Sequence, residues 1–408
     1  MPKLYFGRGT ADLPLHYGKV PLWLSERMSA LGGAIIESIV LDYGKSEALR
    51  RLSDPLWFQS FGCVLGMDWH SSGITTSVMG ALKKAIEPKS RELGIYICGG
   101  KGKYSKQTPS ELMAIANKTG LDGLKLVHAS KLSAKVDNTA IQDGFQLYLH
   151  SFILSDTGEW AVIQQGMNGD AGMARRYHWH SEQFQSFLEN PHTFIYGRNQ
   201  GQILNLTDPL AADTKAGMVE LIRESPARIF PEVKRIIMPS HHEVRMKDVD
   251  LKRLGTILAV AHEKDLRSFE SLLMLEGVGP RTIQSLALVS EVIHGTPSRF
   301  DDPARFSFAH GGKDGHPFPV PTKVYDETIH HLRESVDKAK IGINDKNEAI
   351  RNLSKVIQWM ENDFTPNDNF DGAIQKERDE SHLYGGRTVF GKAKPPKKDK
   401  GSDQLSMF

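Results

Sequence analysis

Residues 268 to 294, SFESLLMLEGVGPRTIQSLALVSEVIH, constrain the fold more than any other stretch of the chain. Apolar residues recur at helical spacing on both sides of residues 277 to 282, GVGPRT, which predicts two helices joined by a tight turn, the first ending at Glu276. The glycines permit this turn and let its backbone N–H groups approach a phosphate, while the second helix adds the positive end of its dipole. A phosphate-binding hairpin is therefore the first prediction.

This hairpin resembles the helix-hairpin-helix DNA-binding motif, which grips one DNA strand without reading its bases. The resemblance implies contacts from Gly277, Val278 and Gly279, supplemented by Arg281 and Thr282. The alternative is an ordinary pair of helices with a glycine at the end of the first. The motif therefore predicts DNA binding that does not depend on base sequence.

Upstream of the hairpin, apolar runs alternate with helical periods in an order that suggests βα units. The predicted strands are GAIIESIVLD (33–42), FGCVLGMD (61–68) and LGIYICGG (93–100), with a helix over 75–87. Two β-rich runs, FQLYLHSFILS and EWAVIQQGM, flank Asp156-Thr157-Gly158 and predict a β-hairpin. A mixed sheet follows from these patterns.

The predicted fold class is α/β with a mixed sheet, followed by a mostly helical domain and a disordered tail. We expect a catalytic α/β domain over 1–232, a helical domain over 233–361 that contains the hairpin, and a flexible tail over 362–408. The tail contains GKAKPPKKDKGSDQ, a mixture of Lys, Pro, Gly and Ser that cannot bury a core.

Overall charge and cysteine content indicate which partners and which cellular compartment to expect. The chain has 51 Lys and Arg against 49 Asp and Glu, so bulk charge does not indicate nucleic acid, although a sum conceals local basic patches. Cys63 and Cys98 lack metal-site spacing and are expected to be buried free thiols in a reducing compartment. Neither a signal segment nor a run of about 20 apolar residues is present, so we expect a cytoplasmic, nucleoid-associated protein with no membrane partner.

The last five residues, QLSMF, follow the predicted flexible tail. Leu405, Met407 and Phe408 can fill a groove while Gln404 hydrogen-bonds at its rim. The pattern resembles the bacterial sliding-clamp-binding motif, which implies a bacterial protein that acts at replication forks or repair patches. The alternative is an apolar end with no partner.

Carboxylates and imidazoles near the predicted strand ends suggest a metal site. Asp42 follows the first strand, Asp68 and His70 follow the second, and His16 lies near the start of the chain. Such groups can hold Mg²⁺ or Mn²⁺, which activates water for phosphodiester cleavage. The alternatives are a helix cap at this loop and a hydrogen-bonded core histidine.

Further polar residues concentrate in three places. Lys101 and Lys103 in GGKGK could contact a DNA backbone or belong to a solvated turn, since the P-loop arrangement is missing. A second group runs from residue 128 to 180 and is either a polar pocket or the solvated rim of a sheet; its members include Lys131, Lys135, Asp137, Asp143, His150, Gln164, Gln165, Arg175, Arg176 and His178. Within it, RRYHWH mixes cations with aromatics, as single-strand binding requires. The third group is FAHGGKDGHPFPVP, at residues 308–321.

Across residues 1 to about 385 the sequence resembles an uncharacterised prokaryotic family, domain of unknown function 763. The passages that carry the resemblance are YFGRGTADLPLHYG, GMDWHSSG, SAKVDNTAIQDGFQLY, VIQQGMN, ARRYHW, GVGPRT and AHGGKDGHPFPV. The resemblance implies a two-part protein with a helix-hairpin-helix, and the tail from about Gly391 lies outside it.

Together the motifs predict a metal-dependent DNA nuclease that is tethered to the sliding clamp. Asp42, Asp68 and His70 would hold the ion, with His16, Asp143 or His178 assisting in metal binding or proton transfer; these are the predicted catalytic and metal residues. One alternative is a DNA glycosylase, because Asp301 and Asp302 follow the hairpin where such enzymes often place a catalytic aspartate. Another is a DNA-binding adaptor without chemistry.

Overall fold

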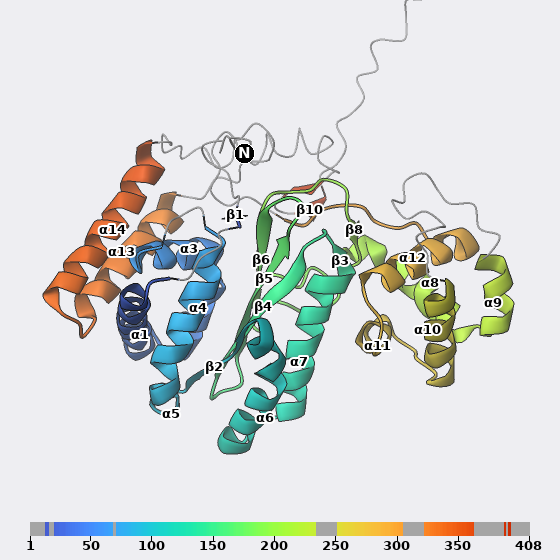
Figure 1. Ribbon diagram of the computed structural model, residues 1–408, viewed down its shortest axis with the longest axis horizontal. Coiled ribbons are helices and arrows are strands. Elements are labelled where there is room, and N and C mark those ends of the chain that lie inside the picture. Colours follow the sequence, from blue (N-terminus) through green and yellow to red (C-terminus); the bar gives the residue numbers. More distant parts are fainter. Residues whose placement is uncertain are drawn as a thin grey trace, which may run out of the picture.

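The computed structural model describes residues 13–15, 20–67, 71–233, 251–304, 322–362, 387–388 and 391–392. A central sheet has helices on both faces, and a further group of helices lies on the outer side of the layer that covers one of these faces (Figure 1). The α/β class predicted from the sequence is confirmed for this part of the chain.

The main sheet has the strand order β1-β6-β5-β4-β2, with β7 paired to β6. Its strands are β1 (Leu13–Pro14), β2 (Ile95–Lys101), β4 (Gln146–Ser155), β5 (Trp160–Asn168), β6 (Met173–His180) and β7 (Phe194–Tyr196). Strands β3 (Ile141–Gln142) and β8 (Leu204–Asn205) form one small pair, and β9 (Arg387–Thr388) and β10 (Gly391–Lys392) another. The predicted hairpin is present as β4 and β5, but all pairings among the described strands are antiparallel, so the sheet is not mixed.

The helices fall into three groups along the chain. The first group is α1 (Leu22–Tyr43), α2 (Lys45–Ser53), α3 (Pro55–Val64), α4 (Gly73–Ile86), η1 (Glu87–Lys89) and α5 (Ser90–Leu93). The second is η2 (Gly102–Gln107), α6 (Thr108–Thr119), α7 (Gly123–Lys135) and the π-helical turn η3 (Val136–Ala140). The third is η4 (Pro209–Ala211), α8 (Ala212–Arg223), α9 (Pro226–Val233), α10 (Leu251–Glu263), α11 (Phe269–Met274), α12 (Pro280–His294), α13 (Thr322–Lys338) and α14 (Ile343–Asn362).

Both faces of the sheet are buried, and strand alternation assigns side chains to each. Phe152 and Val162 join the core beneath α6 and α7, whereas Ile153 and Ile163 join the core beneath α1 to α4. A strand that is buried on both faces has a nearly continuous apolar sequence, which is why residues 145 to 167 could be recognised.

Two of the three strands predicted in the first hundred residues are wrong. Residues 33–42 belong to α1, where Ile35, Ile36 and Ile39 are buried at helical spacing, and residues 61–64 form the end of α3. Every residue of α3 is buried, so its sequence is an unbroken apolar run. Periodicity does not separate such a run from a buried strand, which explains the error.

The helices of the third group pack against two different cores. Helices α8, α10, α11 and α12 share a continuous core with α7 and the sheet, while Leu332, Val336, Ala349 and Leu353 of α13 and α14 join the core of α1 to α4. The domain boundary at residue 233 stays a prediction. Of the predicted tail, 362–408, only Asn362, β9 and β10 lie within the described residues.

In the described part of the chain, every helix is too short or too polar to span a lipid bilayer.

Candidate functional site

The predicted hairpin is a pair of helices joined by an exposed turn. Helix α11 ends at Met274, two residues before the predicted end, and α12 begins at Pro280, three residues before the predicted start. Gly277 has φ +84°, which favours glycine, and the buried side chain of Val278 anchors the turn. Gly279 occupies the N-cap position and offers no side chain to the first N–H groups of α12. These amides and the dipole of a four-turn helix are available to an anion.

The turn is fixed to the end of α7. Lys135 Nζ donates a hydrogen bond to the carbonyl oxygen of Val278 at 2.7 Å, and Gln142 Nε2 donates to that of Pro280 at 2.9 Å. Burial lowers the pKa of Lys135. Because Lys135 ends α7 and Gln142 lies in β3, these two hydrogen bonds join the turn to the chain from α7 to β3 and fix the position of the hairpin relative to it.

One turn earlier along α7 lies a cleft of about 180 Å³. It is formed between η2, the start of α6, α7 and β4, and its walls include Lys106, Ser130, Lys131, Tyr148 and His150. Lys106 and Lys131 are exposed, whereas Ser130 and His150 are only 3% and 6% exposed. The cleft therefore combines a basic rim with a buried polar wall.

The polar wall continues as a chain of hydrogen bonds into the protein. Ser130 Oγ lies 2.8 Å from His150 Nε2, and His150 Nδ1 lies 2.9 Å from Gln164 Oε1. Gln164 Nε2 donates to Asp137 Oδ2 at 2.5 Å, and the same oxygen accepts from Trp179 Nε1 at 3.0 Å. The strand register accounts for one link of this hydrogen-bond chain, because His150 and Gln164 are direct partners across β4 and β5.

The hydrogen bonds determine which nitrogen of His150 carries the proton. Asp137 Oδ2 accepts hydrogen bonds from Trp179 Nε1 and from the amide nitrogen of Gln164, so Gln164 Oε1 faces His150 and accepts from Nδ1–H. His150 Nε2 then has a free lone pair directed at Ser130, and Ser130 Oγ–H donates to it. Burial lowers the pKa of His150 to about 4, so the ring is neutral at neutral pH.

Residues 9–320 match the family described as Protein of unknown function (DUF763). The chain belongs to this family. The match includes the hairpin and the whole cleft, and it ends before α13 and α14, so it is shorter than the stretch predicted from the sequence. Comparison with curated proteins finds no match, and neither does comparison with solved structures.

The two predicted lysines of GGKGK are on the surface beside the cleft. Lys101 lies over the ring of Tyr148 at 5.8 Å, and Lys103 over that of Tyr104 at 5.4 Å. The glycines before them have a packing role, because Gly99 has φ +80° and a side chain there would clash with the carbonyl group of His150. Within the described residues, Lys101, Lys103, Lys106 and Lys131 take part in no salt bridge.

Arg175 and Arg176 are in the interior and do not form the predicted DNA-contact surface. Arg175 Nη1 donates to Asp143 Oδ2 at 2.8 Å, and its Nη2 donates to Asp302 Oδ2 at 2.7 Å. Tyr177 Oη donates to the same oxygen of Asp143 at 2.6 Å. All four side chains are buried, so Asp143 holds a structural ion pair and is remote from solvent.

Arg176 and His178 lie on the opposite face of β6. Arg176 Nε contacts His178 Nε2 at 2.8 Å and its Nη2 donates to Gln59 Oε1 at 2.9 Å, with the guanidinium 4.7 Å from the ring of Phe58. Burial lowers the pKa of Arg176 to about 10 and that of His178 well below its usual value. His178 thus faces an arginine in the core, away from the cleft.

The structure separates Asp42 from any strand end. It lies near the end of α1, where Lys338 Nζ contacts its carboxylate at 3.0 Å and Ser38 Oγ donates to it at 3.3 Å. His16, Asp68 and His70 lie outside the described residues, as do residues 308–321 and the clamp-binding residues Gln404, Leu405, Met407 and Phe408. The two strands whose ends were predicted to carry these groups are helices, and the predicted convergence of Asp42 with Asp68 and His70 stays a prediction because Asp68 and His70 lie outside the described residues.

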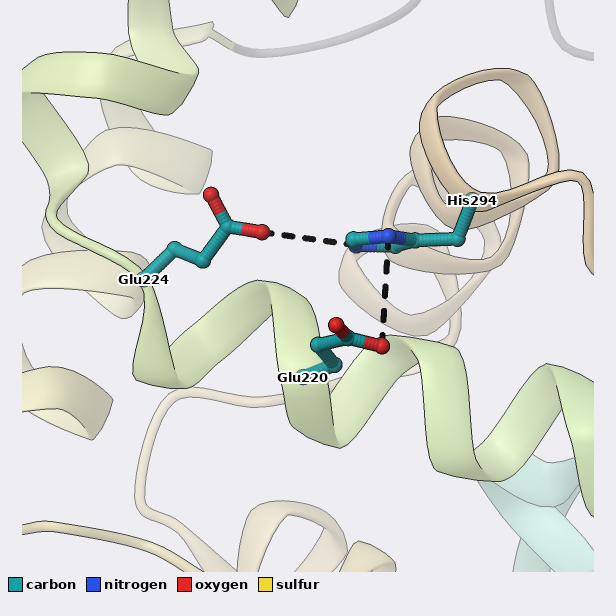
Figure 2. A group of neighbouring side chains, drawn as sticks. All are labelled: Glu220, Glu224 and His294. Atoms are coloured by element: carbon teal, nitrogen blue, oxygen red, sulfur yellow. Dashed lines mark ion pairs between the residues drawn. The ribbon is translucent and has the colours of Figure 1, made fainter.

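One group among the described residues has metal-ligand geometry. Glu220 of α8 and Glu224, which directly follows the last residue of α8, face His294 at the end of α12, and the ligand atoms of the three residues lie within 4.8 Å of one another (Figure 2). His294 Nδ1 is 4.0 Å from Glu220 and Nε2 is 3.8 Å from Glu224. These are ion-pair distances between two packed helices, and the sequence analysis named none of the three residues.

The remaining predicted contact residues differ in exposure. Arg281 is exposed at the first turn of α12, whereas Thr282 is buried in the protein interior.

Ser130 was not predicted from the sequence, although it lines the cleft together with His150. Its only signal was position, since Ser130 and Lys131 precede the polar run that continues to Asp143.

Proposed function

We propose that this protein binds DNA through the α11–α12 hairpin and hydrolyses phosphodiester bonds in the DNA that it holds. The observation that carries the proposal is the attachment of the hairpin to Lys135 at the end of α7 and to Gln142 in β3. This attachment sets the open N-terminus of α12 beside the helix whose next turn lines the cleft. A strand gripped at the turn is thereby directed along α7.

The surface charge near the cleft supports the same function. Lys101, Lys103, Lys106 and Lys131 are exposed cations with no carboxylate partner among the described residues, so they remain available to phosphates. Backbone amides at the turn and lysines at the cleft together explain DNA binding by a chain with a net charge of only +2. The expected affinity is modest and sensitive to salt.

Metal dependence and clamp tethering belong to the proposal on sequence grounds. Asp68 and His70 are proposed to hold Mg²⁺ or Mn²⁺, without Asp42, whose carboxylate is paired with Lys338. Gln404 to Phe408 are proposed to bind a bacterial sliding clamp in the cytoplasm, near the nucleoid. Deleting these five residues should abolish clamp binding and leave the affinity for DNA unchanged.

The test uses the full chain with labelled single-stranded, duplex and flapped DNA, in Mg²⁺, in Mn²⁺ and in EDTA. We expect binding to all three that weakens as salt increases, and strand cleavage that gel electrophoresis detects. Cleavage that EDTA abolishes supports the divalent ion, and the variants Asp68→Ala and His70→Ala should then bind without cutting. Failure to bind any DNA at low salt would rule the proposal out.

The glycosylase alternative is weakened by the surroundings of Asp302. Its carboxylate accepts hydrogen bonds from Arg175, from the backbone N–H of Gln200 and from that of Ala304, and it is buried. A carboxylate with this many donors has no lone pair left for a sugar. Binding without products in every arm of the cleavage assay would favour the adaptor.

A further inference from the structure

We propose that Ser130 is a nucleophile, activated by His150, that attacks the phosphorus of a phosphodiester lying in the cleft. The inference rests on the proposed function, because that function supplies the phosphodiester. Two independent observations carry it: the directed Ser130–His150 hydrogen bond and the cleft that both side chains line.

The hydrogen-bond chain behind His150 is arranged for proton transfer. A serine becomes a nucleophile when a neutral base accepts its proton and a third group orients that base. Here the base is His150 Nε2, and Gln164 orients the ring through Nδ1. Asp137 in turn holds Gln164, so the amide dipole that stabilises a protonated His150 is itself backed by a carboxylate.

Ser130 differs from a nearby buried serine of the same helix in where its hydroxyl group points. Ser133, also buried on α7, satisfies its hydroxyl within the helix by donating to the carbonyl oxygen of Ser130 at 3.1 Å. Ser130 instead directs its hydroxyl across to β4, at the wall of the cleft. The difference between two buried serines of one helix distinguishes the proposed nucleophile from its neighbour.

The charge around the cleft selects the substrate class. Lys106 and Lys131 both line the cleft, so an anionic group entering it meets two ammonium groups. Cations placed where negative charge develops on non-bridging oxygens lower the barrier of phosphoryl transfer. A phosphodiester therefore suits the cleft better than a neutral ester.

The reaction balances with water as the second reactant. Ser130 Oγ forms a bond to phosphorus while its proton passes to His150 Nε2, and the bond from phosphorus to one sugar oxygen breaks as that oxygen takes the proton. One DNA segment is then esterified to Ser130. Water next gives a proton to His150 Nε2 and its oxygen bonds to phosphorus; the Oγ–P bond breaks and Oγ takes the proton back.

The test uses the full chain and bis(p-nitrophenyl) phosphate, a small diester that does not need the hairpin, in Mg²⁺ and in EDTA. Release of p-nitrophenolate should fall about 100-fold or more in Ser130→Ala and in His150→Gln. The matched control Ser133→Ala should retain the wild-type rate. Thermal melting establishes that each variant is folded.

A second measurement does not depend on any variant. After an acid quench, intact wild-type protein should carry the mass of one p-nitrophenyl phosphoryl group, and peptide mapping should place it on Ser130. Undiminished turnover in a folded Ser130→Ala, an adduct at another residue, or neither turnover nor adduct overturns the proposal.

The two proposals can fail separately. If DNA is cleaved equally by wild type and Ser130→Ala, the nuclease function stands and Ser130 is not its nucleophile. If the protein binds no DNA but the diester is cleaved with an adduct on Ser130, the nucleophile stands and the DNA function is wrong.

Discussion

At the scale of single residues, Arg175 shows how strongly buried charges depend on one another. It lies between Asp143 and Asp302, and all three side chains are buried. We predict that Arg175→Ala lowers the free energy of unfolding by about 3–5 kcal/mol, because two buried carboxylates lose their cation. Urea denaturation measures the change, and the exposed Arg91→Ala serves as control. A loss below about 1 kcal/mol would contradict the ion-pair interpretation.

His150 and His178 make a second prediction at this scale, on pH. Burial lowers the pKa of His150 to about 4, so this ring stays neutral in the folded state at pH 5 to 6, and burial also lowers the pKa of His178 well below its usual value. The unfolded chain binds a proton on His150 below a pKa of about 6.5, so this residue should make stability decrease by about 1.4 kcal/mol per pH unit as pH falls from there, and His178 should act in the same direction. Urea midpoints over this range should show a smaller slope in His150→Gln than in wild type, and an unchanged slope would contradict the prediction.

At the scale of elements, the N-terminus of α12 allows stability and DNA affinity to be separated. Gly279 has an extended backbone and open space around its Cβ position, so a side chain fits there. Gly279→Asp should stabilise the protein by a few tenths of a kcal/mol as an N-cap, yet weaken DNA binding about 10-fold or more by placing a carboxylate where a phosphate would bind.

Gly279→Asn is the matched control for this change, since it caps the helix without the charge. Fluorescence anisotropy with labelled DNA and thermal melting provide the two readouts. Equal DNA affinity in the Asp and Asn variants would show that the turn does not face the phosphate backbone.

At the scale of the whole molecule, α13 and α14 close the core of α1 to α4 from a distant part of the sequence. Leu332 is fully buried there. Leu332→Ala should cost about 2–5 kcal/mol of unfolding free energy and increase hydrogen exchange in α1, because it leaves a cavity between α13 and α1. The control is Ile343→Ala at an exposed position of α14. Unchanged exchange in α1 would show that α13 is not needed to stabilise that helix.

The same long-range closure explains which parts of the fold could be predicted. The hairpin of β4 and β5, strand β2 and helix α4 depend on local patterns and were predicted correctly. The predictions at 33–42 and 61–68 were wrong because the helices that cover these runs, α13, α14 and α4, come from other parts of the sequence. Sequence alone does not distinguish a helix buried on every side, as α3 is, from a buried strand, and α1 is buried on one face only.

The amino-acid sequence by itself determined the α/β class, the glycine turn between two helices and the group of polar residues that includes Asp137, His150 and Gln164. Only the tertiary structure decided which of these residues meet. Strand register set His150 beside Gln164, the packing of α7 on β4 brought Ser130 to His150, and burial removed Arg175, Arg176 and His178 from the surface. The physical reason is that hydrogen bonds and ion pairs reach about 3 Å, so side chains of the right chemistry form a site only when long-range packing brings them within that distance.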